Sequence, residues 1–183
     1  MLKTILGVAV LAIAGVLIYA ATKPDTFRVE RSTLIKAPPE KIFPLINDIH
    51  EMQQWSAWEK VDPAMQRTHS GASSGVGAIY EWKGNKEIGS GRMEITESVP
   101  PSRVVIKMDF IEPFPAHNTA AFTLKPEADG NTRVTHAIFG PMPYISKVMS
   151  TFFSMDRMIG DKFEQSLAAL KALAERRPHA PVL

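Results

Sequence analysis

The sequence of 183 residues contains no cysteine. This absence excludes disulfide bonds, thiolate metal sites and cysteine nucleophiles, and it leaves the redox compartment open. Neither sign of charge predominates, because the formal net charge is only +2 and no long basic run occurs. Nothing therefore points to nucleic acid as a partner. Internal repeats and low-complexity tracts are missing as well. With 45% hydrophobic residues, the composition predicts one globular domain with a substantial core, plus a short extra segment.

The extra segment is N-terminal. Between Lys3 and Lys23 lie nineteen uncharged residues, mostly Ile, Leu, Val, Ala and Gly. As a helix this run rises about 28 Å, close to the ~30 Å hydrocarbon core of a bilayer. Tyr19 lies where an interfacial aromatic residue belongs. We therefore predict that residues 1–23 form a single-pass anchor in the cell or inner membrane, with one helix over residues 2–22 that does not pack into the domain.

A cleaved signal peptide is the alternative interpretation of this segment. The apolar region of a signal peptide usually has 7–15 residues and is followed by a cleavage site with small residues at positions −3 and −1. Here Ile18 or Tyr19 would occupy position −3, so we favour a retained anchor. The flanking charges nearly balance, which makes the positive-inside rule close to a tie. The very short tail resembles that of an uncleaved signal and favours a domain on the extracytoplasmic side.

The sequence pattern of the remaining residues predicts one sheet and one long helix. Alternating residues at 27–35 indicate a first strand, and two short helices should follow it, separated at Pro44. Further strands are expected at residues 66–70, 78–82, 87–98, 103–111, 116–125 and 132–139. Apolar residues at three- and four-residue steps then predict one helix over 145–175. An antiparallel sheet of this size needs a cover on one face, and a helix about 45 Å long can provide it.

Four segments resemble the START-like superfamily, also called SRPBCC or the polyketide cyclase/dehydrase and lipid-transport group. They read IKAPPEKIFPLIND at residues 35–48, WSAW at 55–58, GSGRMEI at 89–95 and FEQSLAALK at 163–171. The resemblance implies an α+β helix-grip fold, in which a curved antiparallel sheet of about seven strands surrounds a long C-terminal helix and leaves a ligand cavity between them.

The resemblance covers nearly everything after the anchor. Residues 24–177 are expected to form the helix-grip domain, and residues 178–183 a C-terminal tail. This chain departs from the superfamily at His136, where close relatives commonly carry an aromatic residue, often Trp.

No catalytic constellation is visible in the sequence. The run GASSG at residues 71–75 matches the nucleophile-elbow pattern, but a strand follows it where that motif needs a helix, so we interpret it as a turn. The five histidines are scattered without ligand-type spacing, and no inward pair of carboxylates suits acid–base chemistry. We therefore predict no catalytic residue, no metal site and no cofactor.

Strand parity and the helix stripe predict which residues line the cavity. His136 shares its strand face with Val134 and Ile138, so it is a hydrogen-bonded core residue, a cavity-lining residue or, as a third reading, a general acid or base. We expect Phe152, Ile159, Phe163 and Leu167 to be strongly buried. The predicted ligand-binding residues are Trp82, Met93, Ile106, Met108, Phe122 and His136 from the sheet, Phe152, Met155 and Ile159 from the helix, and Trp55 and Trp58 near the mouth. For the two tryptophans, a simple core position is the alternative interpretation.

Three classes of function remain open at this point. The first is a membrane-tethered, non-catalytic binder of a lipid or another hydrophobic small molecule. The second is a cyclase or dehydratase acting on a similar substrate, as the family resemblance suggests. The third is a module that binds a protein client through its sheet or helix surface. The lack of converging polar side chains favours binding over catalysis, and the anchor favours a lipidic ligand; the oligomeric state is not predicted.

Overall fold

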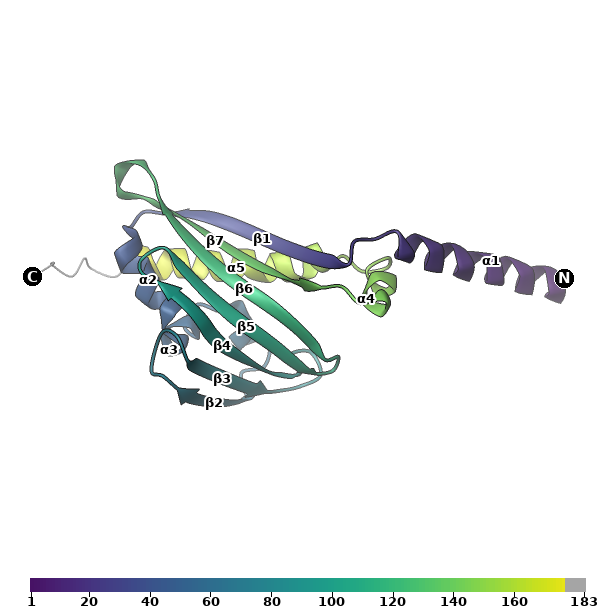
Figure 1. Cartoon of the computed structure of the whole chain (residues 1–183), viewed down its shortest axis with the longest axis horizontal. Coiled ribbons are helices and arrows are strands. Elements are labelled where there is room, and N and C mark those ends of the chain that lie inside the picture. The colour runs from purple at the N-terminus through teal and green to yellow at the C-terminus, as the bar shows by residue number, and fades with distance from the viewer. Residues whose placement is uncertain (177–183) are drawn as a thin grey trace, which may run out of the picture.

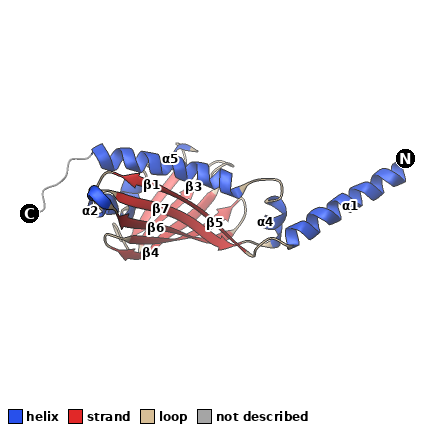
Figure 2. Ribbon diagram, turned by 90° about the horizontal axis from the view of Figure 1, so that it is seen from above, coloured by secondary structure: helices blue, strands red, loops and turns tan. Residues whose placement is uncertain are grey.

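The structure is a computed structural model that describes residues 1–176; the predicted tail at 178–183 lies outside the described residues. A long helix projects from a domain that consists of a curved sheet and a second long helix packed along it (Figures 1 and 2). The elements are α1 (Leu2–Ala21), β1 (Thr26–Ile35), α2 (Pro39–Asn47), α3 (Ile49–Met52), η1 (Ala57–Lys60), β2 (Gln66–Gly71), β3 (Ala78–Lys83), β4 (Ser90–Val99), β5 (Arg103–Glu112), β6 (Ala116–Pro126), η2 (Ala128–Gly130), β7 (Thr132–Pro141), α4 (Tyr144–Met149) and α5 (Met155–Arg176).

The sheet has seven strands in the order β1-β7-β6-β5-β4-β3-β2, and every neighbouring pair is antiparallel. Strands β2 to β7 therefore pair in chain order, and β1 joins the last strand by pairing Thr26 with Pro141 and Ile35 with Thr132. The predicted helix-grip fold with about seven strands is confirmed. The observed strands match the predicted ranges to within a few residues because the alternation of buried and exposed side chains follows the pleat.

Helix α5 covers the open edge of β1 as well as the concave face of the sheet. Arg31 of β1 donates hydrogen bonds to Asp156 and Glu164 of α5. Lys171 donates from Nζ to the Leu34 carbonyl, 2.7 Å away. Covering an edge strand in this way removes a template for pairing with another chain.

Residues 145–175 were predicted to be largely one helix. Helix α5 provides most of it, but residues 150–154 separate a short helix, α4, from α5. Ser150 and Thr151 both donate their hydroxyls to the Lys147 carbonyl, a local bond that competes with regular helical pairing. The Ser154 hydroxyl then accepts the Arg157 amide directly before α5 begins at Met155. Phe152, expected on the buried stripe, is instead 65% exposed.

The two short helices α2 and α3 are present, but Pro44 does not separate them. Pro44 lies inside α2 on its exposed side. The break occurs at Asp48, whose extended backbone ends α2 and whose carboxylate accepts the His50 amide at the start of α3.

Helix α1 extends away from the sheet (Figure 1), and most of its described side chains are exposed. It is long and apolar enough to cross a membrane, and a signal sequence would satisfy the same criterion. Contrary to the expectation of complete separation, its last turns pack on α4. Ala20 is fully buried there, and the Tyr144 hydroxyl donates to the Leu17 carbonyl over 2.8 Å.

Candidate functional site

A cavity of about 350 Å³ lies between the sheet, α5 and the segment around η1. This volume is within the range of about 300–1,000 Å³ that is usual for small-molecule sites. Nine of the predicted ligand-binding residues line it: Trp55, Trp58, Trp82, Met93, Ile106, Met108, Phe122, His136 and Ile159. The other two do not: Phe152 lies in the break before α5, and Met155 is the first residue of α5.

The sheet side of the cavity is formed by inward residues on adjacent strands. Met93 of β4 and Met108 of β5 are directly paired, and Trp82 of β3 is opposite Gly91. A Cβ atom at Gly91 would overlap the Trp82 indole, so the glycine makes room for this ring against the sheet. The indole Nε1 donates to the Ile88 carbonyl over 3.4 Å. Flexible methionines beside rigid aromatic rings give the wall an adaptable apolar surface.

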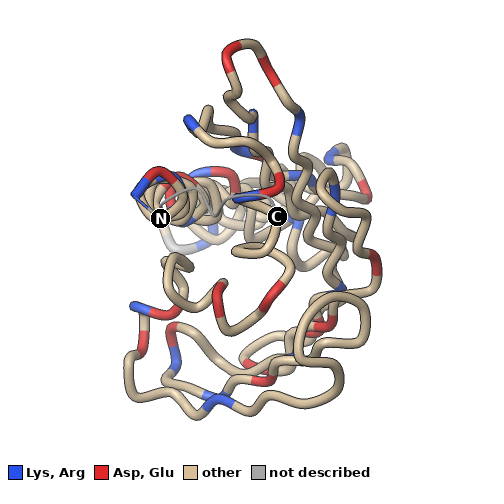
Figure 3. The backbone as a smooth tube through the Cα atoms, turned by 90° about the vertical axis from the view of Figure 1, so that its left-hand side faces the viewer, with Lys and Arg blue, Asp and Glu red and all other residues tan. Residues whose placement is uncertain are grey.

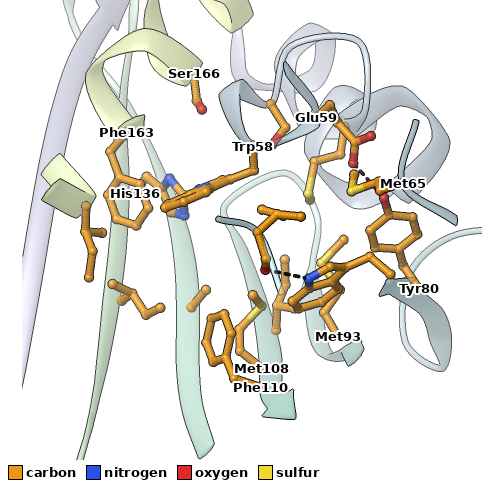
Figure 4. A pocket seen from close by; sticks show the side chains of 18 of the residues that line it. Trp58, Glu59, Met65, Tyr80, Met93, Met108, Phe110, His136, Phe163 and Ser166 are labelled. Atoms are coloured by element: carbon orange, nitrogen blue, oxygen red, sulfur yellow. Dashed lines mark hydrogen bonds between the residues drawn. The ribbon is translucent and has the colours of Figure 1, made fainter. Parts of the chain in front are cut away.

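His136 is stacked between two phenyl rings at the end of the cavity nearest α5. Its ring centroid is 4.0 Å from that of Phe122 and 3.6 Å from that of Phe163, and Figure 4 shows it facing the cavity. Burial lowers the pKa of His136 to about 3, because the charged form loses hydration without gaining a counter-charge. The buried Nδ1 has no hydrogen-bond partner within residues 1–176. His136 is therefore both a core residue and part of the cavity wall. Unlike the hydrogen-bonded core histidine that was predicted, it has no hydrogen bond at Nδ1.

The two tryptophans of the WSAW segment lie in different environments. Trp55 is only 2% exposed; it contacts Phe122 edge-on and donates from Nε1 to the Leu45 carbonyl over 2.9 Å. It lines the cavity from inside the core, so the core interpretation of Trp55 is confirmed and its placement at the mouth is wrong. Trp58 is partly exposed and points from η1 into the cavity toward His136 (Figure 4).

A polar cluster on the opposite wall was not predicted. Glu59 of η1 accepts from the Tyr80 hydroxyl and from Arg67 Nε, each at 2.7 Å, and both Glu59 and Tyr80 line the cavity. Burial, with the hydrogen bond to Glu59, raises the pKa of Tyr80 well above its usual value. Tyr80 shares the parity of Trp82 and was therefore detectable from the sequence. Glu59 lies in a short 3-10 helix, where no alternation or helical spacing of apolar residues shows which side chains face inward.

The α5 side consists of Ile159, Phe163 and Ser166. Phe163 and Leu167 are buried as predicted, whereas Ile159 is only half-buried. The Ser166 hydroxyl accepts the Ala57 amide over 2.9 Å, which ties η1 to α5 and fixes one side of the cavity.

The described part of the chain holds no cluster of three or more His, Asp or Glu side chains suited to a metal ion. Acidic and basic residues are interspersed over the domain (Figure 3), so its surface carries no large field of one sign. Among the polar groups of the cavity wall, the Tyr80 hydroxyl is bound to Glu59, the Trp82 indole to the Ile88 carbonyl and the Ser166 hydroxyl to the Ala57 amide. What the site offers a guest is a mainly apolar surface.

A curved antiparallel sheet closed by a C-terminal helix over an apolar cavity defines the helix-grip class of proteins. Within it, the chain belongs to the polyketide cyclase / dehydrase and lipid transport family, whose model matches residues 26–175. A search of curated proteins finds no significant match.

Solved structures share this fold at low sequence identity. Protein CV1439 from Chromobacterium violaceum is 20% identical with a TM-score of 0.57, over 84% of this chain and all of that one. The Aha1 dimer from Colwellia psychrerythraea is 18% identical with a TM-score of 0.55, over 82% of this chain and 97% of that one. The di-domain ARO/CYC protein StfQ of the steffimycin biosynthetic pathway has a TM-score of 0.61 at 12% identity, over 83% of this chain and 51% of that one.

Proposed function

We propose that this chain is a membrane-tethered binding protein that holds a hydrophobic small molecule or lipid in the cavity between the sheet and α5, without transforming it. The observation that carries the proposal is the cavity of about 350 Å³ with its mainly apolar wall. Its volume is at the lower end of the usual range, which favours a single acyl chain or a few fused rings.

The state of the polar residues supports binding over proton transfer. A general acid or base works best with a pKa near the operating pH, and the pKa of His136 is lowered to about 3. The pKa of Tyr80 is raised, so this side chain stays neutral. Glu59 is already engaged by Tyr80 and Arg67.

The contact between α1 and α4 supports a retained anchor over a cleaved signal. Ala20 is fully buried and Leu17 accepts the Tyr144 hydroxyl, so cleavage after Ala20 or Ala21 would remove part of a packed contact. The mature protein should therefore begin at or near Met1 and fractionate with membranes. An N-terminus near Thr22, or recovery in the soluble fraction, would contradict the tether.

Binding can be tested with an anthroyloxy-labelled fatty acid and the detergent-solubilised full-length protein. The Met108→Trp variant should bind the probe more weakly, because the larger side chain occupies the middle of the cavity. Met155→Trp is the matched control, since Met155 lies outside the cavity wall and its replacement should leave binding unchanged. Equal binding by the wild type and Met108→Trp would overturn the proposal, and native mass spectrometry would identify any co-purifying lipid.

A further inference from the structure

Five apolar side chains are exposed together where α1 joins the domain. Three belong to α4 and two to the connector that follows it: Tyr144, Ile145, Met149, Phe152 and Phe153, which are 41–66% exposed. We refer to these five residues as the interfacial patch. Figure 1 shows α4 directly beside the domain end of α1. Single exposed apolar residues are ordinary, but a contiguous group marks an interaction surface.

Polar side chains of the same segment pair with the linker between α1 and β1. Lys147 of α4 is only 8% exposed and pairs with Asp25 over 2.5 Å. Lys23, the first charged residue after α1, donates to the Ser150 hydroxyl over 2.9 Å. A segment that buries its lysine and exposes Ile145 and Phe153 reverses the pattern of a water-facing helix. The exposed face therefore suits an apolar surrounding.

The hydrogen bond between Tyr144 and Leu17 fixes the depth of this segment relative to α1. Leu17 precedes Lys23 by six residues, which is about 9 Å along a helix axis at 1.5 Å per residue. If Lys23 lies at the head groups, α4 is held below that level, within the ~5–10 Å to which interfacial helices are buried. Tyr144 and Tyr19 then both lie where interfacial aromatic residues are enriched.

The cavity opens at the same end of the sheet. Strand pairing brings Lys83, Ser90, Glu112, Ala116 and the Thr26–Pro141 pair to this end. The four exposed residues of the cavity lining are found at this end: Glu87 precedes β4, Glu112 is the last residue of β5, and Pro113 and Phe114 follow it. The mouth of the cavity therefore lies on the side from which α1 departs.

We propose that the interfacial patch lies in the lipid interface of the bilayer that α1 spans, so that the domain rests on the membrane with its cavity mouth facing the lipids. This inference rests on the proposed tether and deepens it. A ligand would then pass between bilayer and cavity with little exposure to water. The continuity of the patch with α1, through the Tyr144–Leu17 and Lys23–Ser150 bonds, is the reason to assign lipid as its occupant.

The test uses the absence of cysteine from the chain. Single-cysteine variants Ile145→Cys and Phe153→Cys of the full-length protein are labelled with bimane and reconstituted in phosphatidylcholine vesicles with or without doxyl-labelled lipid. Val76→Cys is the matched control, because Val76 is similarly exposed, at 58%, in the turn before β3 at the opposite end of the sheet. Val10→Cys, in the middle of α1, reports the tether itself.

We expect quenching by doxyl lipid at positions 10, 145 and 153 and none at position 76. Quenching at position 10 alone would overturn the membrane-facing orientation and leave the tether intact. Loss of quenching at position 10 would refute the tether and this inference together. Equal quenching at positions 76 and 145 would also refute the orientation, because it would mean adsorption without a preferred side. Unchanged circular dichroism of each labelled variant controls for folding.

Discussion

Replacing His136 with Phe should make the stability of the domain less sensitive to acid. A phenyl ring retains the stack between Phe122 and Phe163 and removes the titrating group. In the wild type the pKa of His136 is lowered from 6.5 to about 3 by burial. Between these two values the unfolded chain holds a proton that the folded chain does not, so the free energy of unfolding decreases as the pH falls.

The magnitude follows from the two pKa values. The contribution of His136 is fully present above pH 6.5 and is lost by as much as about 1.36 kcal/mol for each pH unit toward pH 3. From pH 7.5 to pH 5 the loss is about 2 kcal/mol by this relation. The free energy of unfolding of His136→Phe should not show this loss of about 2 kcal/mol. At pH 7.5 it should be at least as stable as the wild type, because the unpaired Nδ1 is gone.

The assay is urea unfolding of the detergent-solubilised full chain at pH 7.5 and pH 5, followed by tryptophan fluorescence. Other groups with shifted pKa, such as His69 and Asp109, titrate equally in both proteins. The difference between the two pH effects therefore isolates His136. Identical losses in the wild type and His136→Phe would refute the reasoning, since they would mean that His136 is hydrated or charged in the folded state.

Two further substitutions test the packing around the cavity. Phe163→Ala removes a ring that is only 3% exposed and should lower the free energy of unfolding by about 3–5 kcal/mol, measured by urea unfolding; a loss below about 1 kcal/mol would contradict the packing described for α5. Gly91→Ala places a Cβ against the Trp82 indole and should destabilise the domain by about 1–3 kcal/mol, with a shift in tryptophan emission. Unchanged emission and stability would mean that the indole lies elsewhere.

Strand parity predicted most of the sheet wall of the cavity from the sequence. Trp82, Met93, Met108 and Phe122 are found on the expected face, because an alternating strand with one buried face has only one register that hides its apolar residues. The same parity predicted the inward position of His136. Parity could not predict the stacking of His136 between Phe122 and Phe163, because this depends on how α5 crosses the sheet.

The errors occurred where a local bond overrode a regular pattern. The apolar spacing continues through Phe152 and Met155, so periodicity alone predicts an unbroken helix. The hydroxyls of Ser150 and Thr151, which bond to the Lys147 carbonyl, end α4 instead. Serine and threonine side by side inside an apolar stripe were the available signal.

The pairing of β1 with β7 has a consequence for biosynthesis. The two strands are adjacent in the sheet, with Ile35 paired to Thr132, yet they are separated by about a hundred residues of chain. Translation at roughly 5–20 residues per second makes β1 wait about 5–20 s for its strand partner β7. During that interval α1, made first, is already available to the membrane. Under the proposed tether, the domain is therefore assembled beside the bilayer, and β7 and α5 complete it after α1 has been anchored.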